Sequence, residues 1–228
     1  MIEIHNLKKL FKDKIAVNIP SAHFMTNANV CIMGNNGAGK TTLLRLICNL
    51  LSPTEGYVNY TDFANKIFDS RKVAAFLDES FLFEYLTVSE YFELIISIND
   101  LDKIKFKNSL KIWEAFFDYQ KNKNVLISNL SVGNRNKVGI LSAILQNKPL
   151  LILDEPFANI DPSSQNILLS FFKENKKSQS VTILLSSHNI DHSFEIADQV
   201  ILLENGAIIQ NSTDILNSKQ TILNYFNK

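Results

Sequence analysis

The stretch "GNNGAGKTT", residues 34–42, decides how this 228-residue sequence is expected to fold. The chain has only seven glycines, and three of them fall within this stretch. The apolar run "NANVCIMG" before it is short enough for a buried strand, and "TTLLRLICNLL" after it places leucines at helical spacing. The glycines therefore mark a strand-to-helix junction, which is typical of an α/β fold.

The same stretch matches the pattern G-x-x-x-x-G-K-[ST], whose residue types suit the binding of phosphate groups. Glycines let the backbone curl until successive N–H groups form a nest for an anion, and the following helix adds the positive end of its dipole. Lys40 is expected to reach the β- and γ-phosphates of a nucleotide, and the Thr41 hydroxyl to bind Mg²⁺. The predicted nucleotide-binding residues of this loop are Gly34, Asn35, Asn36, Gly37, Ala38, Gly39, Lys40, Thr41 and Thr42.

Two further apolar runs end in polar residues of a kind that phosphate chemistry requires. "PLLILDEP" (149–156) ends in Asp154 and Glu155, and "SVTILLSSH" (180–188) ends in His188. Buried strands that alternate with helices predict a mostly parallel sheet covered on both faces, with ligands beyond the carboxyl ends of its strands. The glycine loop, the acid pair and the histidine should therefore form one site.

Each of these residues has an expected role in that site. Asp154 would hold Mg²⁺ directly or through water, Glu155 would act as the general base on the attacking water, and His188 would contact the γ-phosphate. Taken alone, an acid pair at a strand end also fits a solvated turn, and a single histidine also fits a structural role. Their position after a phosphate loop favours the catalytic interpretation.

The two ends of the chain predict antiparallel strands. "IEIHNLKKLF" (2–11) and "AVNIPSAHFM" (16–25) have the length and composition of short strands, and "QVILLENGAIIQ" (199–210) predicts a hairpin with Asn205-Gly206 as its tight turn. An antiparallel β subdomain is therefore expected beside the parallel sheet.

The middle of the chain predicts helices. Residues from about 89 to 120 carry apolar residues at helical spacing, and Thr87 with Glu90 predicts a capping box. We expect one domain over residues 1–228, in which 1–78 and 146–228 form the α/β core with its antiparallel β subdomain and about 79–145 form an inserted helical subdomain.

Composition excludes several classes of protein. The 23 basic residues balance the 23 acidic ones, which argues against a dedicated nucleic-acid-binding protein. Cys31 and Cys48 lie in apolar sequence and are expected to be buried, reduced thiols. The N-terminus lacks the apolar core of a signal peptide, and no apolar run reaches the roughly 18 residues that span a bilayer. We therefore expect a cytoplasmic protein whose membrane role, if any, comes through a partner.

The motifs, in this order, resemble the nucleotide-binding subunits of the ATP-binding cassette (ABC) family over nearly the whole chain. "GNNGAGKTT" resembles the Walker A loop, "LLILDEP" the Walker B strand, "NIDP" with Asp161 the D-loop region, and His188 the switch histidine. Phe11 stands where the family has an aromatic that stacks on adenine. "LSVGN" (130–134) resembles the signature motif, most often written LSGGQ.

The resemblance implies an ATP-dependent dimer. In this family two cassettes pair head to tail, and the signature motif of one closes over the ATP held by the other. Ser131 would offer a hydroxyl and Gly133 a backbone N–H at the start of a helix whose dipole favours phosphate. Ser131 considered alone also fits a simple helix cap. The partner cassette would be a second copy or a similar ATPase subunit.

Two departures from the family pattern stand out. Val132 and Asn134 replace the usual glycine and glutamine of the signature motif. The glutamine of the family's Q-loop is also missing, and aligning the chain by its "LTV" places Asp78 at that position with Glu79 next. Asp78 is therefore the predicted third metal residue, since a carboxylate can bind Mg²⁺ or orient water, and the choice between the two acids stays open.

The resemblance implies the ATPase subunit of an ABC transporter, bound to a multi-span membrane protein at the inner face of the cell membrane. Phe81, Phe83 and Tyr85 fit either a docking surface for that partner or the core of the helical subdomain. "SFLFEYLTVSEYF" (80–92) resembles cassettes of peptide, antibiotic or drug exporters. The alternatives are a soluble ABC ATPase of the iron–sulfur cluster assembly type and a non-hydrolysing scaffold, which the intact Lys40, Glu155 and His188 argue against.

Overall fold

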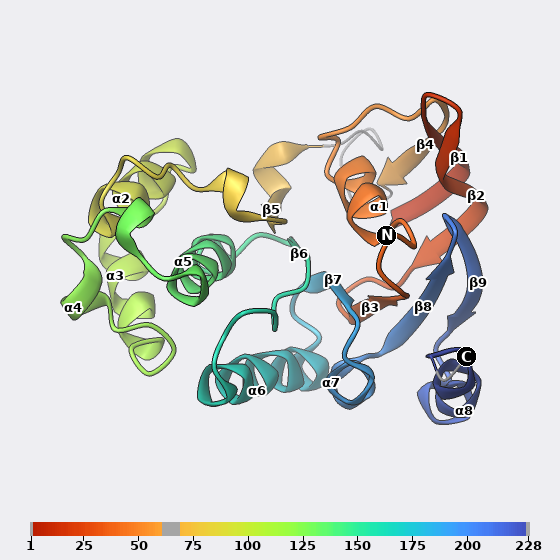
Figure 1. The fold of residues 1–228 in the computed structure, drawn as a ribbon. Coiled ribbons are helices and arrows are strands. Elements are labelled where there is room, and N and C mark those ends of the chain that lie inside the picture. The colour runs from red at the N-terminus through yellow and green to blue at the C-terminus, as the bar shows by residue number, and fades with distance from the viewer. Residues whose placement is uncertain (1, 61–68, 227–228) are drawn as a thin grey trace.

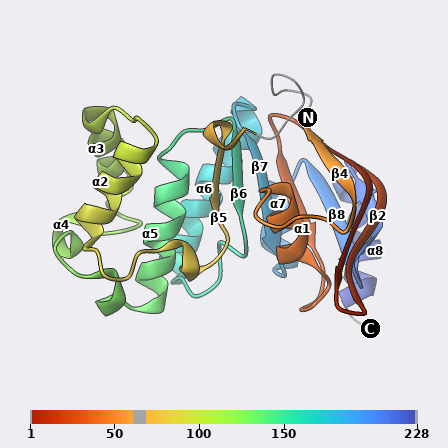
Figure 2. The ribbon, with the colours of Figure 1, turned by 90° about the horizontal axis from the view of Figure 1, so that it is seen from above.

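Two sheets organise the chain in the computed structural model, which describes residues 2–60 and 69–226. A six-stranded sheet has the strand order β5-β6-β7-β3-β8-β9, and a three-stranded sheet has the order β2-β1-β4. Helices α2 to α5 and the three-stranded sheet lie at opposite ends of the molecule, with the six-stranded sheet between them (Figure 2).

The six-stranded sheet is parallel apart from its last strand. Its strands are β5 (Val73–Phe76), β6 (Leu150–Leu153), β7 (Thr182–Ser187), β3 (Asn29–Met33), β8 (Gln199–Glu204) and the antiparallel β9 (Ala207–Ser212). Every residue of β3, β6 and β7 is buried, as expected for strands covered on both faces. The predicted α/β class with a mostly parallel sheet is therefore confirmed.

Side chains alternate between the two faces of this sheet and enter two cores. Met33 and Leu185 pack on one face with α5 (Val132–Ile144), α6 (Pro162–Ser178) and α7 (Ile190–Ile196). Ile32 and Leu184 pack on the other with α1 (Lys40–Ile47) and the three-stranded sheet. Figure 1 shows α6 and α7 on one side of the sheet and α1 on the other.

The three-stranded sheet contains both strands predicted near the N-terminus. β1 (Ile2–Phe11) pairs antiparallel with β2 (Lys14–Phe24), and β1 also pairs with β4 (Glu55–Tyr60). The sequence pattern did not predict β4, whose "EGYVNY" has a single fully buried residue and begins with two weak strand formers. The predicted hairpin at the other end of the chain is present, and its turn residues Asn205 and Gly206 both have positive φ, at 48° and 80°.

The middle of the chain is helical, as predicted. It contains α2 (Val88–Ile98), α3 (Lys103–Ile112), α4 (Tyr119–Asn122) and α5. The predicted capping box is formed, because Glu90 N–H donates to Thr87 Oγ1 at 3.3 Å and Thr87 N–H donates to Glu90 Oε2 at 2.8 Å. The subdomain boundaries near residues 79 and 145 stay a prediction.

The last helix that the structure describes is α8 (Ile215–Phe226), which lies beside the hairpin of β8 and β9 (Figure 1). Cys31 and Cys48 are buried and free, and burial raises the pKa of Cys48 to about 12. Over residues 2–60 and 69–226, no helix combines the length and apolar character needed to cross a membrane.

Candidate active site

The phosphate loop connects the end of β3 to the start of α1, as its sequence predicts. Gly37 and Gly39 have φ of 81° and 106°, a region that favours glycine. A Cβ on Gly39 would also lie 2.6 Å from the carbonyl oxygen of Ala16, closer than any side chain tolerates. The loop closes with a hydrogen bond from Ala38 N–H to the Asn35 carbonyl at 3.1 Å. The glycines therefore allow both the turn and its close packing.

Lys40 places a buried ammonium group over this loop. Its Nζ donates to the Gly34 carbonyl at 2.8 Å and to the Asn35 carbonyl at 3.5 Å, and lies 3.4 Å from Glu155 Oε1. A buried cation needs anionic or carbonyl partners. Phosphate oxygens can supply the same partners, so the position of Lys40 suits the binding of a nucleotide's phosphates.

Asp154 and Thr41 lie side by side at the carboxyl end of β6. The Thr41 hydroxyl donates to Asp154 Oδ2 at 2.5 Å, and the Ser186 hydroxyl donates to Asp154 Oδ1. Burial raises the pKa of Asp154, although these two hydroxyl groups oppose the shift. A hydroxyl and a carboxylate are oxygen ligands of the kind that Mg²⁺ prefers, so the pair fits the predicted metal site.

Glu155 lies between Lys40 and His188. Its Oε2 accepts from His188 Nδ1 at 2.8 Å and from the His188 backbone N–H at 3.3 Å. Its own backbone N–H donates to Ser186 Oγ at 2.9 Å, and its φ is 45°, an unusual value for a residue other than glycine. The backbone therefore holds this carboxylate where the ends of three strands meet.

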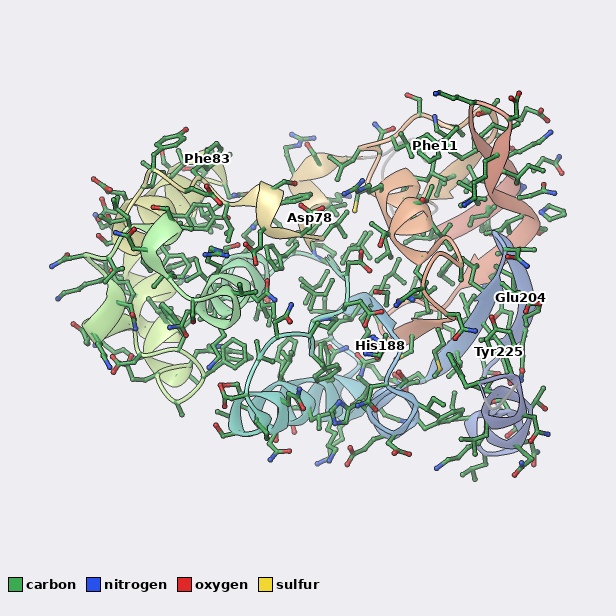
Figure 3. All side chains as sticks on the ribbon, viewed as in Figure 1. Phe11, Asp78, Phe83, His188, Glu204 and Tyr225 are labelled. Carbon is green, nitrogen blue, oxygen red and sulfur yellow. The ribbon has the colours of Figure 1, made fainter. Side chains whose placement is uncertain are left out.

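A cavity of about 440 Å³ lies over the loop and brings most of the predicted residues together. Its predicted lining residues are Phe11, Asn36, Gly37, Ala38, Gly39, Lys40, Thr41, Thr42 and Glu155. Phe11 is 51% exposed, with Lys9 Nζ 5.4 Å from the centroid of its ring. In the view of Figure 3, Asp78 lies on the other side of α1 from Phe11.

Sequence reasoning missed several residues of this site. Lys14 lines the cavity because it pairs with Phe11 across the β1–β2 turn, and Asn205 lines it because the β8–β9 turn packs beside the loop. The Ser186 hydroxyl donates a hydrogen bond to the Asp154 carboxylate and accepts one from the Glu155 backbone N–H. The serine pair before His188 was the available signal, because hydroxyls at the end of a buried strand need acceptors.

Ser131 and Gly133 do not line this cavity. Ser131 caps α5, and its Oγ accepts from Asn134 N–H at 3.3 Å. A Cβ on Gly133 would lie 2.5 Å from the Asn159 carbonyl oxygen, so the glycine lets α5 pack against the segment after β6. The helix-cap interpretation is thus observed in the single chain, and the role of both residues in a dimer stays a prediction.

Asp78 and Glu79 each bind an arginine. Asp78 Oδ2 accepts from Arg45 at 2.7 Å, and Glu79 Oε2 accepts from Arg135 at 2.6 Å. Burial acts against ionisation of Asp78, but hydrogen bonds from Ser80 and Arg45 outweigh it and lower its pKa. Both acids line a cavity of about 210 Å³ together with Asp154 and Glu155. No group of three or more metal-binding side chains occurs in the described part of the chain, and metal binding by Asp78 stays a prediction.

A P-loop fold with this site defines a nucleotide-binding protein, and comparisons with known proteins give the family. The sequence model of the family described as "ABC transporter" matches residues 17–158. The ABC transporter ATP-binding protein YhaQ of Bacillus subtilis (strain 168) is 31% identical over 206 residues, which cover 90% of this chain and 69% of that protein. The zinc import ATP-binding protein ZnuC of Rickettsia bellii is 31% identical over 211 residues, 91% of this chain and 84% of that protein.

Solved structures agree with this assignment. An ATP-binding subunit of an ABC transporter superposes with a TM-score of 0.84 at 25% identity, covering 98% of this chain and 94% of that one. The cassette MJ0796, in a dimer bound to ADP and Pi, superposes with a TM-score of 0.82 at 23% identity and shows the same fold. The chain belongs to the ABC transporter family, and it is an ATP-binding ATP hydrolase of that family.

Proposed function

We propose that this chain is the ATPase subunit of an ABC transporter, working as a pair of cassettes on a membrane-spanning partner. The observation that carries the catalytic part is the contact of the Glu155 carboxylate with both Lys40 and His188 beside the phosphate loop. A general base, a phosphate-binding cation and a second hydrogen-bonding group are thereby brought to one place.

Each of these residues has a separate role in hydrolysis. The loop N–H groups and Lys40 bind the phosphates, and Thr41 and Asp154 would hold Mg²⁺, which would neutralise phosphate charge. Glu155 takes the proton from the attacking water, and His188 orients this carboxylate through its Nδ1. Phe11 stands at the open edge of the cavity, where a base can stack on its exposed ring.

The second cassette completes the site. Ser131 and Gly133 lie at the N-terminus of α5, away from the cavity of their own chain. A helix N-terminus attracts anions, so these residues suit the γ-phosphate of ATP held by another chain. A second copy or a similar ATPase subunit supplies the partner.

The membrane partner docks on the segment before α2. Phe83 and Tyr85 are exposed there, with ring centroids 5.9 Å apart, whereas Phe81 packs against both cores. Exposed neighbouring aromatics suit a protein interface. Through this partner the chain sits at the inner face of the cell membrane. Export follows only from the resemblance of residues 80–92 to exporter cassettes, and it stays a prediction because relatives include the zinc import protein ZnuC and the choline transport protein OpuBA.

Purification from native membranes tests the transporter role. The Glu155→Gln protein would be used as bait in mild detergent with Mg-ATP, and a stoichiometric multi-span membrane protein is expected to co-purify. The same bait carrying Phe83→Ser and Tyr85→Ser should lose that protein while still binding ATP. Recovery from the soluble fraction with soluble partners only would instead support the iron–sulfur cluster assembly type of ATPase.

A further inference from the structure

Residues 79–87 hold the segment that leads into "LSVGN". Part of this contact is made by backbone groups. Ile127 N–H donates to the Leu86 carbonyl at 2.9 Å, and Ser128 N–H donates to the Glu84 carbonyl at 3.1 Å. The approach to the signature motif is therefore tied to the same stretch of chain that carries the exposed aromatics before α2.

A side-chain contact ties the two segments together again. The turn at Glu79–Phe81 packs against α5 (Figure 2). Arg135, near the start of α5, donates through Nε to Glu79 Oε2 at 2.6 Å and through Nη1 to the Leu130 carbonyl at 2.8 Å. The Arg135 side chain is 19% exposed. Because one planar guanidinium joins both acceptors, the Leu130 carbonyl takes its position from the Glu79 carboxylate.

The Leu130 carbonyl lies directly before the cap of α5. The Leu130 side chain is buried, so the residue is packed as well as hydrogen-bonded. Ser131 Oγ accepts from Asn134 N–H at 3.3 Å, and the Ser131 carbonyl accepts from Arg135 N–H at 2.9 Å. A shift of the Leu130 carbonyl would therefore turn the Ser131 hydroxyl and the first N–H groups of the helix. These are the groups that would meet the ATP of a second cassette.

The neighbouring acid faces a different helix. Asp78 Oδ2 accepts from Arg45 on α1 at 2.7 Å, and the Arg45 side chain is 46% exposed. An exposed pair of this kind is screened by water and salt, whereas a pair that is mostly buried is screened much less. Of the two ion pairs, Glu79–Arg135 is therefore the stronger constraint, and it acts on the helix that begins with the signature motif.

We propose that Arg135 is a positioning residue for the pairing of two cassettes, because its contacts with Glu79 and the Leu130 carbonyl set the direction of Ser131 towards the ATP of the other chain. The inference rests on the head-to-tail pairing proposed above. It also gives the Glu79 carboxylate a task other than metal binding, since the guanidinium of Arg135 uses one of its oxygens.

Sedimentation of the Glu155→Gln protein with Mg-ATP tests this role. Adding Arg135→Gln should raise the protein concentration at half-pairing by about threefold to tenfold, the range expected for the loss of one hydrogen bond. Mg-ADP binding by the single chain, measured by calorimetry, should stay unchanged, because Arg135 does not line the nucleotide cavity. Arg71→Gln, which breaks an exposed ion pair with Asp69, is the matched control and should leave pairing unchanged.

Glu79→Gln separates positioning from a direct contact of Arg135 with nucleotide. This change keeps the positive charge of Arg135 but weakens its attachment. A positioning role predicts weaker pairing in Glu79→Gln, and a combined loss with Arg135→Gln that is smaller than the sum of the two. If Arg135 itself bound the ATP of the other chain, Glu79→Gln would free it, and pairing would be unchanged or tighter. That result would overturn the proposal.

Amide hydrogen exchange tests the contact in the single chain. Exchange of the Asn134 N–H should be faster in Glu79→Gln than in the parent, because the Ser131 cap that accepts from it is held less firmly. Unchanged exchange would contradict the positioning role. A Glu155→Gln protein that stays monomeric with Mg-ATP would contradict the proposed pairing itself. If it pairs equally well with and without Arg135→Gln, only the positioning role fails.

Discussion

At the scale of single residues, the site is built around one carboxylate with opposing partners. Lys40 Nζ contacts one oxygen of Glu155, and His188 Nδ1 contacts the other. While it contacts this carboxylate, the Lys40 ammonium group has fewer N–H donors left for a phosphate. Nucleotide binding should therefore draw Lys40 away from Glu155 and free one carboxylate oxygen for water.

Glu155→Gln should separate binding from hydrolysis. The amide cannot accept the proton from water, so kcat for phosphate release should fall by about 10²- to 10⁴-fold, the usual contribution of general base catalysis. The affinity for Mg-ATP should be unchanged or tighter, because Lys40 no longer interacts with a charged carboxylate. Glu195→Gln, which removes a surface acid paired with Lys173, is the control and should keep both values. Full hydrolysis by Glu155→Gln would show that another group is the base.

The sequence predicts residues of this site where chemistry fixes both residue type and spacing. Glycines, a lysine and a threonine must follow one another in a phosphate loop, so Lys40 and Thr41 were evident without a structure. Ser186 was not evident from the sequence, because its contact with Asp154 depends on the register between β6 and β7. Phe11 was placed only by resemblance to the family, since nothing local distinguishes it from other exposed aromatics.

At the scale of elements, the contact between α5 and β5 depends on a glycine. A Cβ on Gly139 would lie 2.1 Å from the ring of Phe76, so helix and strand approach too closely for any side chain. Gly139 is buried in α5 although glycine weakens a helix by about 1 kcal/mol relative to alanine. Close packing therefore outweighs helix propensity at this position.

Gly139→Ala should destabilise the fold for that reason. The added methyl overpacks the contact and should lower the free energy of unfolding by about 1–3 kcal/mol, measured by urea denaturation. Combining it with Phe76→Leu, which makes room, should cost less than the sum of the two single changes. A Gly139→Ala protein more stable than the parent would mean that helix propensity decides instead.

The start of α6 gives a prediction with a defined pH dependence. Asp161 caps this helix, and hydrogen bonds first from Lys137 and then from Ser163 and Ser164 hold its pKa well below the usual range. Because the folded-state pKa is the lower one, the stabilisation is present above the unfolded value of about 4 and is lost as pH falls below it. Asp161→Ala should therefore cost about 1 kcal/mol of stability at pH 7.

Urea unfolding across pH checks the sign of this effect. The difference in stability between the parent and Asp161→Ala should be constant from pH 8 to pH 5 and should shrink below about pH 4. Asp161→Asn keeps a side-chain oxygen for the cap but loses the charge, so it should show a smaller cost at pH 7. A difference that grew as pH fell would contradict the assignment.

Elements were predictable where local pattern and tertiary packing agree. The capping box before α2 and the Asn205-Gly206 turn are encoded locally and were found. β4 and β5 were not predicted, because each is short and takes its strand conformation from a neighbouring strand. That neighbour is β1 for β4 and β6 for β5. Strand propensity is context-dependent, so such edge strands need the sheet to define them.

At the scale of the whole molecule, the proposed function gives one chain two incomplete halves of a site. The phosphate loop precedes α1, and the signature residues begin α5, on separate parts of the fold (Figure 1). Asn136 Nδ2 donates to the Ala158 carbonyl at 3.2 Å, and Lys137 Nζ donates to Asp161 Oδ2 at 2.6 Å, which ties α5 to the segment after the Walker B acids. Movement of α5 on partner binding would therefore displace the segment that follows Glu155.

If this arrangement works as proposed, ATP should hold two chains together. The Glu155→Gln protein, which retains unhydrolysed ATP, should sediment as two chains with Mg-ATP and as one chain with Mg-ADP. Adding Ser131→Arg places a bulky side chain at the start of α5 and should leave the protein monomeric with Mg-ATP, although its own phosphate loop still binds nucleotide. Ser170→Arg, on the exposed side of α6, is the matched control and should not affect pairing. A Glu155→Gln protein that remains monomeric at saturating Mg-ATP would mean that "LSVGN" caps a helix and does not clamp ATP. The replacement of the family's usual residues by Val132 and Asn134 would then be the reason.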